Sequence, residues 1–108
     1  MKSLAMTYVD MGLTNPEYDL KERTEDELID YMMKATPDVL VYFQLIDDSE
    51  AHGYTYLKGD CHVLCIATRN YFVLAHELAH IMDDRGLHGK NLHDAHFMEN
   101  WRRIIKEN

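Results

Sequence analysis

Three polar residues at helical spacing carry the clearest chemistry in the chain. His76, Glu77 and His80 belong to the run His-Glu-Leu-Ala-His, inside the apolar stretch of residues 71–82. Side chains four residues apart lie one above the other on an α-helix, with about 5–6 Å between their Cβ atoms. Two imidazoles in this arrangement can bind one zinc ion at about 2.1 Å each. The pattern therefore predicts a metal-binding helix.

Glu77 follows the first histidine by one residue, so its side chain is rotated by about 100° around the helix. The carboxylate then lies beside the metal, where a general base can take a proton from an activated water. The chain has seven histidines, so chance alone can also produce the pattern. The apolar helix argues against chance, because a buried and unpaired His-Glu-His set would be costly. Asp83 or Asp84, just beyond the helix, could accept the N–H of a ligating imidazole.

A catalytic zinc needs a third protein ligand and one open position. The candidates downstream are Asp83, Asp84, His88, His93, Asp94, His96 and Glu99. Phe97 begins the apolar stripe of the last predicted helix, and His93 stands four residues before it on the same face. We therefore rank His93 first, then His88 in a glycine-bounded loop, then His96, which points about 120° away from the stripe. The sequence leaves open whether His88 or His96 replaces or supplements His93.

Cys61, His62 and Cys65 raise the question of a second metal site. In a strand, the two cysteines share one face and His62 points to the other, so a tetrahedral site cannot readily form. The cysteines would also lie about 13 Å apart, too far for a disulfide. We interpret them as reduced core residues.

The elements that would position these residues are grouped by type along the chain. The predicted order is a helix at about 25–35, strands at about 39–46, 53–57 and 61–68, and helices at about 71–83 and 92–106. Thr24 and Glu27 form a capping-box signature for the first helix, and Asn70 and Asn91 can cap the other two. This order predicts an α+β fold in which a small, mostly antiparallel sheet of three strands packs against the metal-binding helix and the C-terminal helix.

The domain organisation is simple. Residues 1–20 are polar and predict an N-terminal arm or a short helix, and residues 21–108 predict a single domain. The net charge of −8, from 11 Lys plus Arg and 19 Asp plus Glu, repels nucleic acid and anionic membranes, so we expect neither as a partner. The first ten residues lack the apolar core of a signal peptide, so we expect a cytoplasmic protein. The oligomeric state stays open.

Two sequence runs resemble a known group of enzymes. HELAH at 76–80, a glycine-containing loop, and HDAHF at 93–97 are similar to the motif pair of the SprT-like and WLM zinc metallopeptidases. The run GYTYLKGDCHVLCIAT, a glycine-led hairpin ahead of the metal helix, is similar as well. The resemblance covers about residues 52–106.

The resemblance implies a zincin-like fold and a bound Zn2+. The implied metal ligands are His76, His80 and His93. It further implies that Glu77 is the catalytic base and that Phe97 is an aromatic anchor. In such proteases the strand before the metal helix, here 61–68, is an edge strand along which an extended substrate lies.

These observations lead to three functional hypotheses. The first is a zinc-dependent metallopeptidase that hydrolyses a peptide or protein substrate with Glu77 as general base. Tyr54, Tyr56 and His88 are candidates to assist its oxyanion. The second is a non-catalytic acidic interaction protein in which a zinc with four protein ligands, including His88 or His96, only stabilises the fold. The third is a metal-dependent hydrolase of non-peptide substrates.

Overall fold

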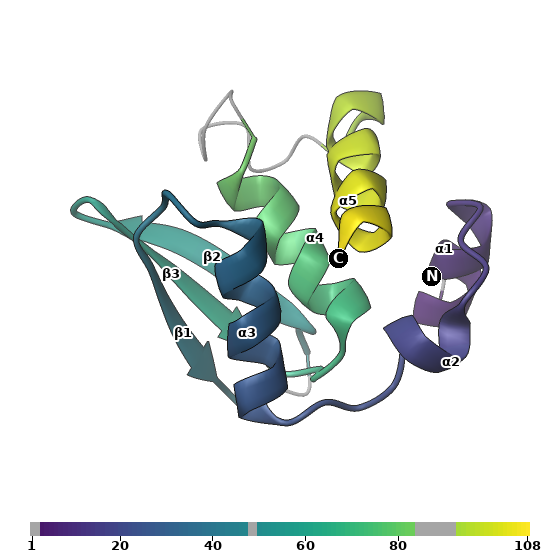
Figure 1. Cartoon of the computed structure of the whole chain (residues 1–108), viewed down its shortest axis with the longest axis horizontal. Coiled ribbons are helices and arrows are strands. Elements are labelled where there is room, and N and C mark those ends of the chain that lie inside the picture. Colours follow the sequence, from purple (N-terminus) through teal and green to yellow (C-terminus); the bar gives the residue numbers. More distant parts are fainter. Residues whose placement is uncertain (1–2, 48–49, 84–92) are drawn as a thin grey trace.

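The helices and strands form two layers, a sheet and a set of helices on one of its faces (Figure 1). The computed structural model describes residues 3–47, 50–83 and 93–108. The elements are α1 (Leu4–Asp10), α2 (Pro16–Asp19), α3 (Glu25–Ala35), β1 (Val41–Leu45), β2 (Gly53–Lys58), β3 (Cys61–Ile66), α4 (Tyr71–Ile81) and α5 (Ala95–Glu107). The predicted α+β class is confirmed.

The sheet is mixed, with the strand order β1-β3-β2. β2 and β3 form the expected antiparallel hairpin, which turns at Gly59 with a φ of 64°. β1 pairs parallel with β3, so the prediction of a mostly antiparallel sheet holds for only one of the two strand pairs.

The expectation that the strand at 61–68 lies at the sheet edge is wrong, because β3 is the central strand. Val63 and Cys65 are buried on one of its faces, and Leu64 and Ile66 on the other. A strand that buries both faces is most stable in the middle of a sheet. β2 alternates between half-buried and exposed residues over most of its length and forms an edge instead.

Local capping explains where the helices begin. The predicted capping box of α3 is present, with Thr24 and Glu27 bonded reciprocally. Asn70 caps α4 by accepting a hydrogen bond of 2.8 Å from the N–H of Val73. α5 begins later than predicted, because Asp94 is its N-cap and accepts from the N–H of Phe97 at 3.1 Å. The proposed cap Asn91 lies outside the described residues.

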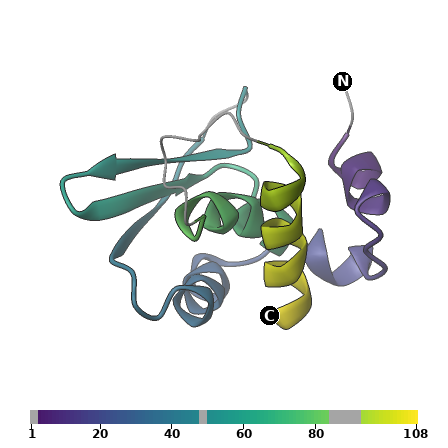
Figure 2. The same cartoon turned by 90° about the horizontal axis from the view of Figure 1, so that it is seen from above.

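α4 is the central helix of the core. It contacts α5, α3 and both strands of the hairpin. Its own Phe72, Leu74 and Leu78 are fully buried, and they meet Leu64 from β3 and Phe97 from α5 in one apolar cluster. Figure 2 shows α4 lying beneath the sheet, with α5 beside it. The helix that carries the metal-binding pattern is therefore held on several sides.

The segment for which we expected an arm or a short helix contains α1 and α2, at the end of the molecule away from the sheet (Figures 1 and 2). Tyr8 attaches this end, since only 1% of it is exposed and its ring meets Phe72 edge-on at 5.2 Å. Its hydroxyl donates to Asp19 at 2.5 Å and accepts from the N–H of Asn15 at 2.9 Å. Within the described residues, none of the helices combines the length and the apolar composition that crossing a bilayer requires.

Candidate metal centre

Three imidazoles meet between α4 and the start of α5. The ring centroids of His76, His80 and His93 form a nearly equilateral triangle with sides of 5.0, 5.0 and 5.1 Å. One nitrogen from each ring lies within 4.8 Å of the other two. The Nε2 atoms of His80 and His93 are 3.2 Å apart. Two ligands of one tetrahedral zinc are separated by about 3.4 Å, so this spacing fits a shared cation.

Two local features bring the third imidazole to the other two. The four-residue spacing on α4 stacks His76 and His80 on one face of the helix. Asp94 then fixes the first turn of α5, and His93 stands immediately before this cap. The sequence argument placed His93 in the first turn of the helix, whereas it precedes the helix, and it lies beside His76 and His80 because α5 packs along α4.

Aromatic side chains of α5 form the support of the triad. The ring of Phe97 stacks on His80 at 4.4 Å and meets His93 edge-on at 4.8 Å. Trp101 contacts the ring of His76 edge-on at 4.6 Å, and its own Nε1–H donates to the carbonyl of Phe72 at 2.9 Å. These contacts restrict the imidazole rotamers, which prepares the site for a ligand.

Burial keeps the histidines in the form that binds metals. Burial, together with the like charges that His80 and His93 carry when protonated, lowers the pKa of His76 to about 3. Burial and the charge of His93 likewise lower the pKa of His80 to about 4, while Asp83 acts in the opposite direction. Both imidazoles are therefore neutral near pH 7, with a nitrogen lone pair available.

Glu77 lies inside the protein next to this triad, with 4% of its surface exposed. Its Oε2 is 3.8 Å from the Nε2 of His76. Burial raises its pKa to about 7, well above the ordinary value of a carboxyl group. A buried carboxyl beside potential metal ligands is the arrangement that a general base requires.

Gly53 of β2 permits this closeness of sheet and helix. A Cβ atom at this position would lie 2.9 Å from the carbonyl oxygen of Cys65 and 3.5 Å from the Cγ of Glu77. The carbonyl oxygen of Cys65 leaves room only for glycine at this position, and the side chain of Glu77 lies within ordinary contact range of it.

Within the described residues, none of the other proposed ligands joins the triad. The Nε2 of His96 lies 3.9 Å from Asp83, and half of its side chain is exposed. Asp83 itself is buried near His80, in keeping with a supporting role. His88 and Asp84 lie outside the described residues. Among the described residues, His76, His80 and His93 are the one group of histidines, cysteines and carboxylates close enough to hold a metal ion.

The remaining candidates lie elsewhere on the sheet. Cys61 and Cys65 are free thiols, as expected from their spacing. Tyr54 and Tyr56 are exposed and stack on each other at 6.2 Å. Because side chains alternate along a strand, both belong to the face opposite Gly53. Tyr54 still borders the cavity at the triad, whereas Tyr56 does not.

Two cavities open at the site. One of about 220 Å³ is lined by the triad, Glu77 and residues 53–55 of β2. A neighbouring cavity of about 400 Å³ extends from His76 and Glu77 toward α1 and includes His52, Val73 and Trp101.

Sequence reasoning missed His52. Its Nδ1 lies 2.6 Å from the hydroxyl of Thr68, and its backbone carbonyl accepts from the N–H groups of Ala67 and Thr68. The sequence signal that could have identified His52 is its position directly before Gly53, the glycine at which β2 begins.

The described residues thus combine three converging nitrogen ligands, a buried carboxylate and an adjoining cavity. Such a set can bind a transition metal and activate water against a polarised bond. The chain matches no protein-family model, no curated protein and no solved structure.

Proposed function

We propose that the chain is a zinc-dependent metallopeptidase. The observation that carries this proposal is the convergence of His76, His80 and His93 beside the buried carboxylate of Glu77. Among the described residues no fourth side chain joins the three nitrogens, and the proposed mechanism assigns the fourth position of the zinc to a reactant.

Zinc is the metal that this set of donors favours. Imidazole nitrogens suit zinc, copper, iron and nickel, and a three-histidine site with an open position is a common catalytic zinc environment. The low pKa values of His76 and His80 keep both ligands neutral, so binding requires little proton release near pH 7. A zinc ion would supply Lewis acidity to water and to the substrate carbonyl.

Glu77 would act as general acid and base. Its carboxylate takes a proton from the attacking water and delivers it to the leaving amine. Its pKa of about 7 without a metal means that it holds a proton readily inside the protein. A cation held by the triad would lower this pKa and keep Glu77 ionised at neutral pH, ready to accept the proton.

The outer edge of β2, which pairs with β3 on its other side, is the surface that we assign to the substrate backbone, in place of the strand at 61–68. Gly53, Tyr54 and Thr55 line the cavity of the triad, and β2 is one of the two edge strands. An extended peptide added to this edge would run past the histidines, and its backbone would supply affinity independent of side-chain sequence.

His52 is our candidate for assisting the oxyanion. It shares a cavity with His76 and Glu77, and Thr68 fixes its ring through Nδ1. Its Nε2 would donate to a substrate carbonyl oxygen, the role for which Tyr54, Tyr56 and His88 were considered. Tyr56 is exposed and stacks on Tyr54 on the far face of the sheet, which argues against a role of Tyr56 at the oxyanion.

The proposal is tested by metal content, coordination and cleavage together. Protein loaded with one zinc should cleave an unstructured protein substrate, and X-ray absorption should find three imidazoles and one oxygen at the metal. Glu77→Gln should bind zinc equally and lack cleavage. Four protein ligands and no cleavage would favour the structural-zinc alternative, and hydrolysis of activated esters without peptide cleavage would favour a non-peptide hydrolase.

A further inference from the structure

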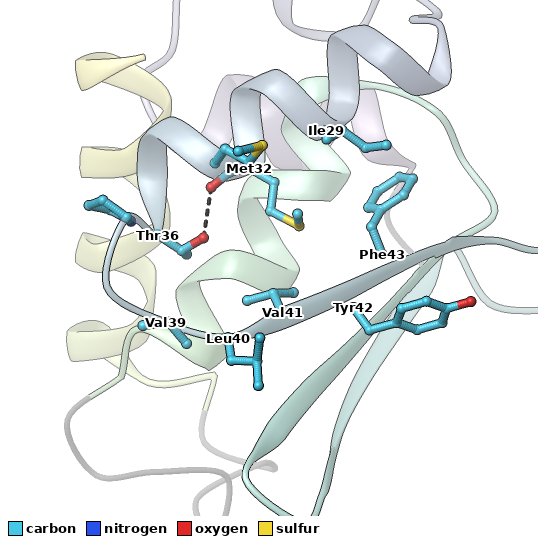
Figure 3. A pocket seen from close by; sticks show the side chains of 10 residues that line it. Ile29, Met32, Thr36, Val39, Leu40, Val41, Tyr42 and Phe43 are labelled. Atoms are coloured by element: carbon cyan, nitrogen blue, oxygen red, sulfur yellow. Dashed lines mark hydrogen bonds between the residues drawn. The ribbon is translucent and has the colours of Figure 1, made fainter.

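A larger apolar groove lies between α3 and β1, and it shares no lining residue with the two cavities at the triad. Its volume is about 620 Å³. The lining includes Ile29, Met32 and Met33 from α3 and Leu40, Val41 and Phe43 from the following segment. Figure 3 shows Phe43 rising from β1 toward Ile29, with Met32 above Val41.

The groove exposes side chains that are usually buried. Met33 is 61% exposed, Leu40 67% and Tyr42 59%. Thr36, the polar side chain at one end, donates its hydroxyl to the carbonyl of Met32 at 2.8 Å, so it is already bonded within α3 (Figure 3). Single exposed apolar side chains are ordinary, but a contiguous set around a groove marks a surface that binds something.

The second feature of this surface is the open edge of β1. In the described part of the chain, β1 pairs with β3 alone. The carbonyl of Leu40 and the N–H of Ile46 bond to β3, so the alternation of a parallel ladder directs the N–H and C=O groups of Val41, Phe43 and Leu45 outward. The strand reads VYFQL and contains none of the charges or prolines that commonly protect an edge from strand addition.

The rim of the groove is acidic. Asp26, Ile29, Asp30 and Met33 share one face of α3 at helical spacing, and both aspartates are exposed. Asp38 is exposed in the turn that leads to β1. Lys34 is the single basic residue of α3. An apolar groove with this rim attracts a segment that combines apolar and basic side chains.

We propose that the α3–β1 groove binds an extended segment of a partner protein, which adds as a strand to β1. Alternate apolar side chains of this segment fill the groove, and its Lys or Arg residues pair with Asp26, Asp30 and Asp38. The five residues of β1 accommodate a segment of similar length, about 17 Å. A second copy of the chain is a poorer occupant, because two acidic rims and two net charges of −8 would repel each other.

The test uses the full chain and short random peptides displayed on phage. Selection should enrich sequences that alternate apolar residues and carry Lys or Arg. An enriched peptide, synthesised and labelled, should lose at least about tenfold in affinity on Met33→Glu or Leu40→Ser. Both residues are largely exposed, so these variants should fold. Met6→Glu, on the 56% exposed Met6 of α1, is the matched control and should bind normally.

One further variant and one modified peptide separate the electrostatic component of recognition from the backbone component. Asp30→Lys should weaken the basic peptide and reduce the salt dependence of its binding. Methylation of the peptide amides that face β1 should abolish binding, because strand addition needs those N–H groups. The proposal is overturned if selection enriches no such peptide, if binding is insensitive to Met33 and Leu40, or if the groove instead mediates dimers that Met33→Glu dissociates.

Discussion

His80 and His93 face each other across the start of α5 with their Nε2 atoms 3.2 Å apart. His80 belongs to α4 and His93 directly precedes the N-cap of α5, so neither secondary-structure element alone creates the pair. Burial and the charge of His93 lower the pKa of His80, so the ring of His80 is neutral near pH 7 and has a lone pair available to a cation.

The first prediction concerns the third ligand. His93→Ala should weaken zinc binding by at least about 100-fold, because one of the three ligands is lost. The fold should be retained, because His93 is exposed. Competition with a chromophoric chelator measures the affinity, and circular dichroism monitors the fold. His96→Ala is the matched control, since His96 is also exposed near the start of α5 and faces Asp83. Equal zinc affinity of the two variants would exclude His93 as a ligand.

The second prediction concerns the pH dependence of the metal-free protein. The folded-state pKa values of about 3 for His76 and about 4 for His80 lie below the ordinary value of 6.5. Below that value the unfolded chain binds protons that the folded chain does not, so stability falls as the pH drops from 6.5 toward 4. We expect a loss of roughly 1 kcal/mol for each histidine by about pH 5.5.

Urea unfolding at a series of pH values measures this loss. The double variant His76→Gln/His80→Gln removes both titrating groups, so the loss of stability toward acid pH should disappear and leave the opposite dependence that the raised pKa of Glu77 contributes. A loss of stability toward acid pH that persists in this variant would assign the effect to other groups. Saturating zinc at pH 7 should raise the wild-type stability by about 4 kcal/mol when free zinc exceeds the dissociation constant a thousandfold, an increase that chelation reverses.

The sequence predicts the local features of the site and misses those set by distant pairing. Thr24 and Asn70 predict the starts of α3 and α4, because a capping side chain bonds to the backbone of the first turn of its own helix. The placement of His93 follows from the apolar face that Phe97 begins, because that face must pack on the core. The patterns of single segments could not identify the central strand, because β1 pairs with β3, and β2 lies between them in the sequence. The cavity at His52 depends on the same long-range arrangement.

The third prediction separates the two roles of a buried carboxylate. Burial raises the pKa of Glu77 to about 7, so the metal-free fold loses stability as the pH rises from the ordinary value of 4.5 through 7. Glu77→Gln does not ionise, and at about pH 8 its metal-free form should exceed the wild type by about 2–3 kcal/mol. The same variant should bind zinc and lack cleavage. Thermal unfolding at about pH 5 is the internal control, because the stability difference should nearly vanish there. An unchanged difference at both pH values would contradict the raised pKa.

The fourth prediction concerns the contact of β2 with the site. In Gly53→Ala the new methyl group would meet the carbonyl oxygen of Cys65 at 2.9 Å, and this backbone atom cannot rotate away. β2 must then shift away from β3, which also moves it relative to Glu77, and we expect a loss of about 1–3 kcal/mol in stability together with reduced cleavage. Zinc affinity should change little, because the histidines belong to α4 and the residue before α5.

A matched control for this substitution is available on the same strand pair. Gly59 adopts a φ of 64° but has open space around it, so Gly59→Asn should be tolerated because asparagine enters the left-handed region at low cost. Chemical denaturation compares the two variants, and peptide cleavage at equal zinc loading isolates the catalytic effect. If Gly53→Ala matches Gly59→Asn in both stability and cleavage, the close approach of β2 has no part in forming the site.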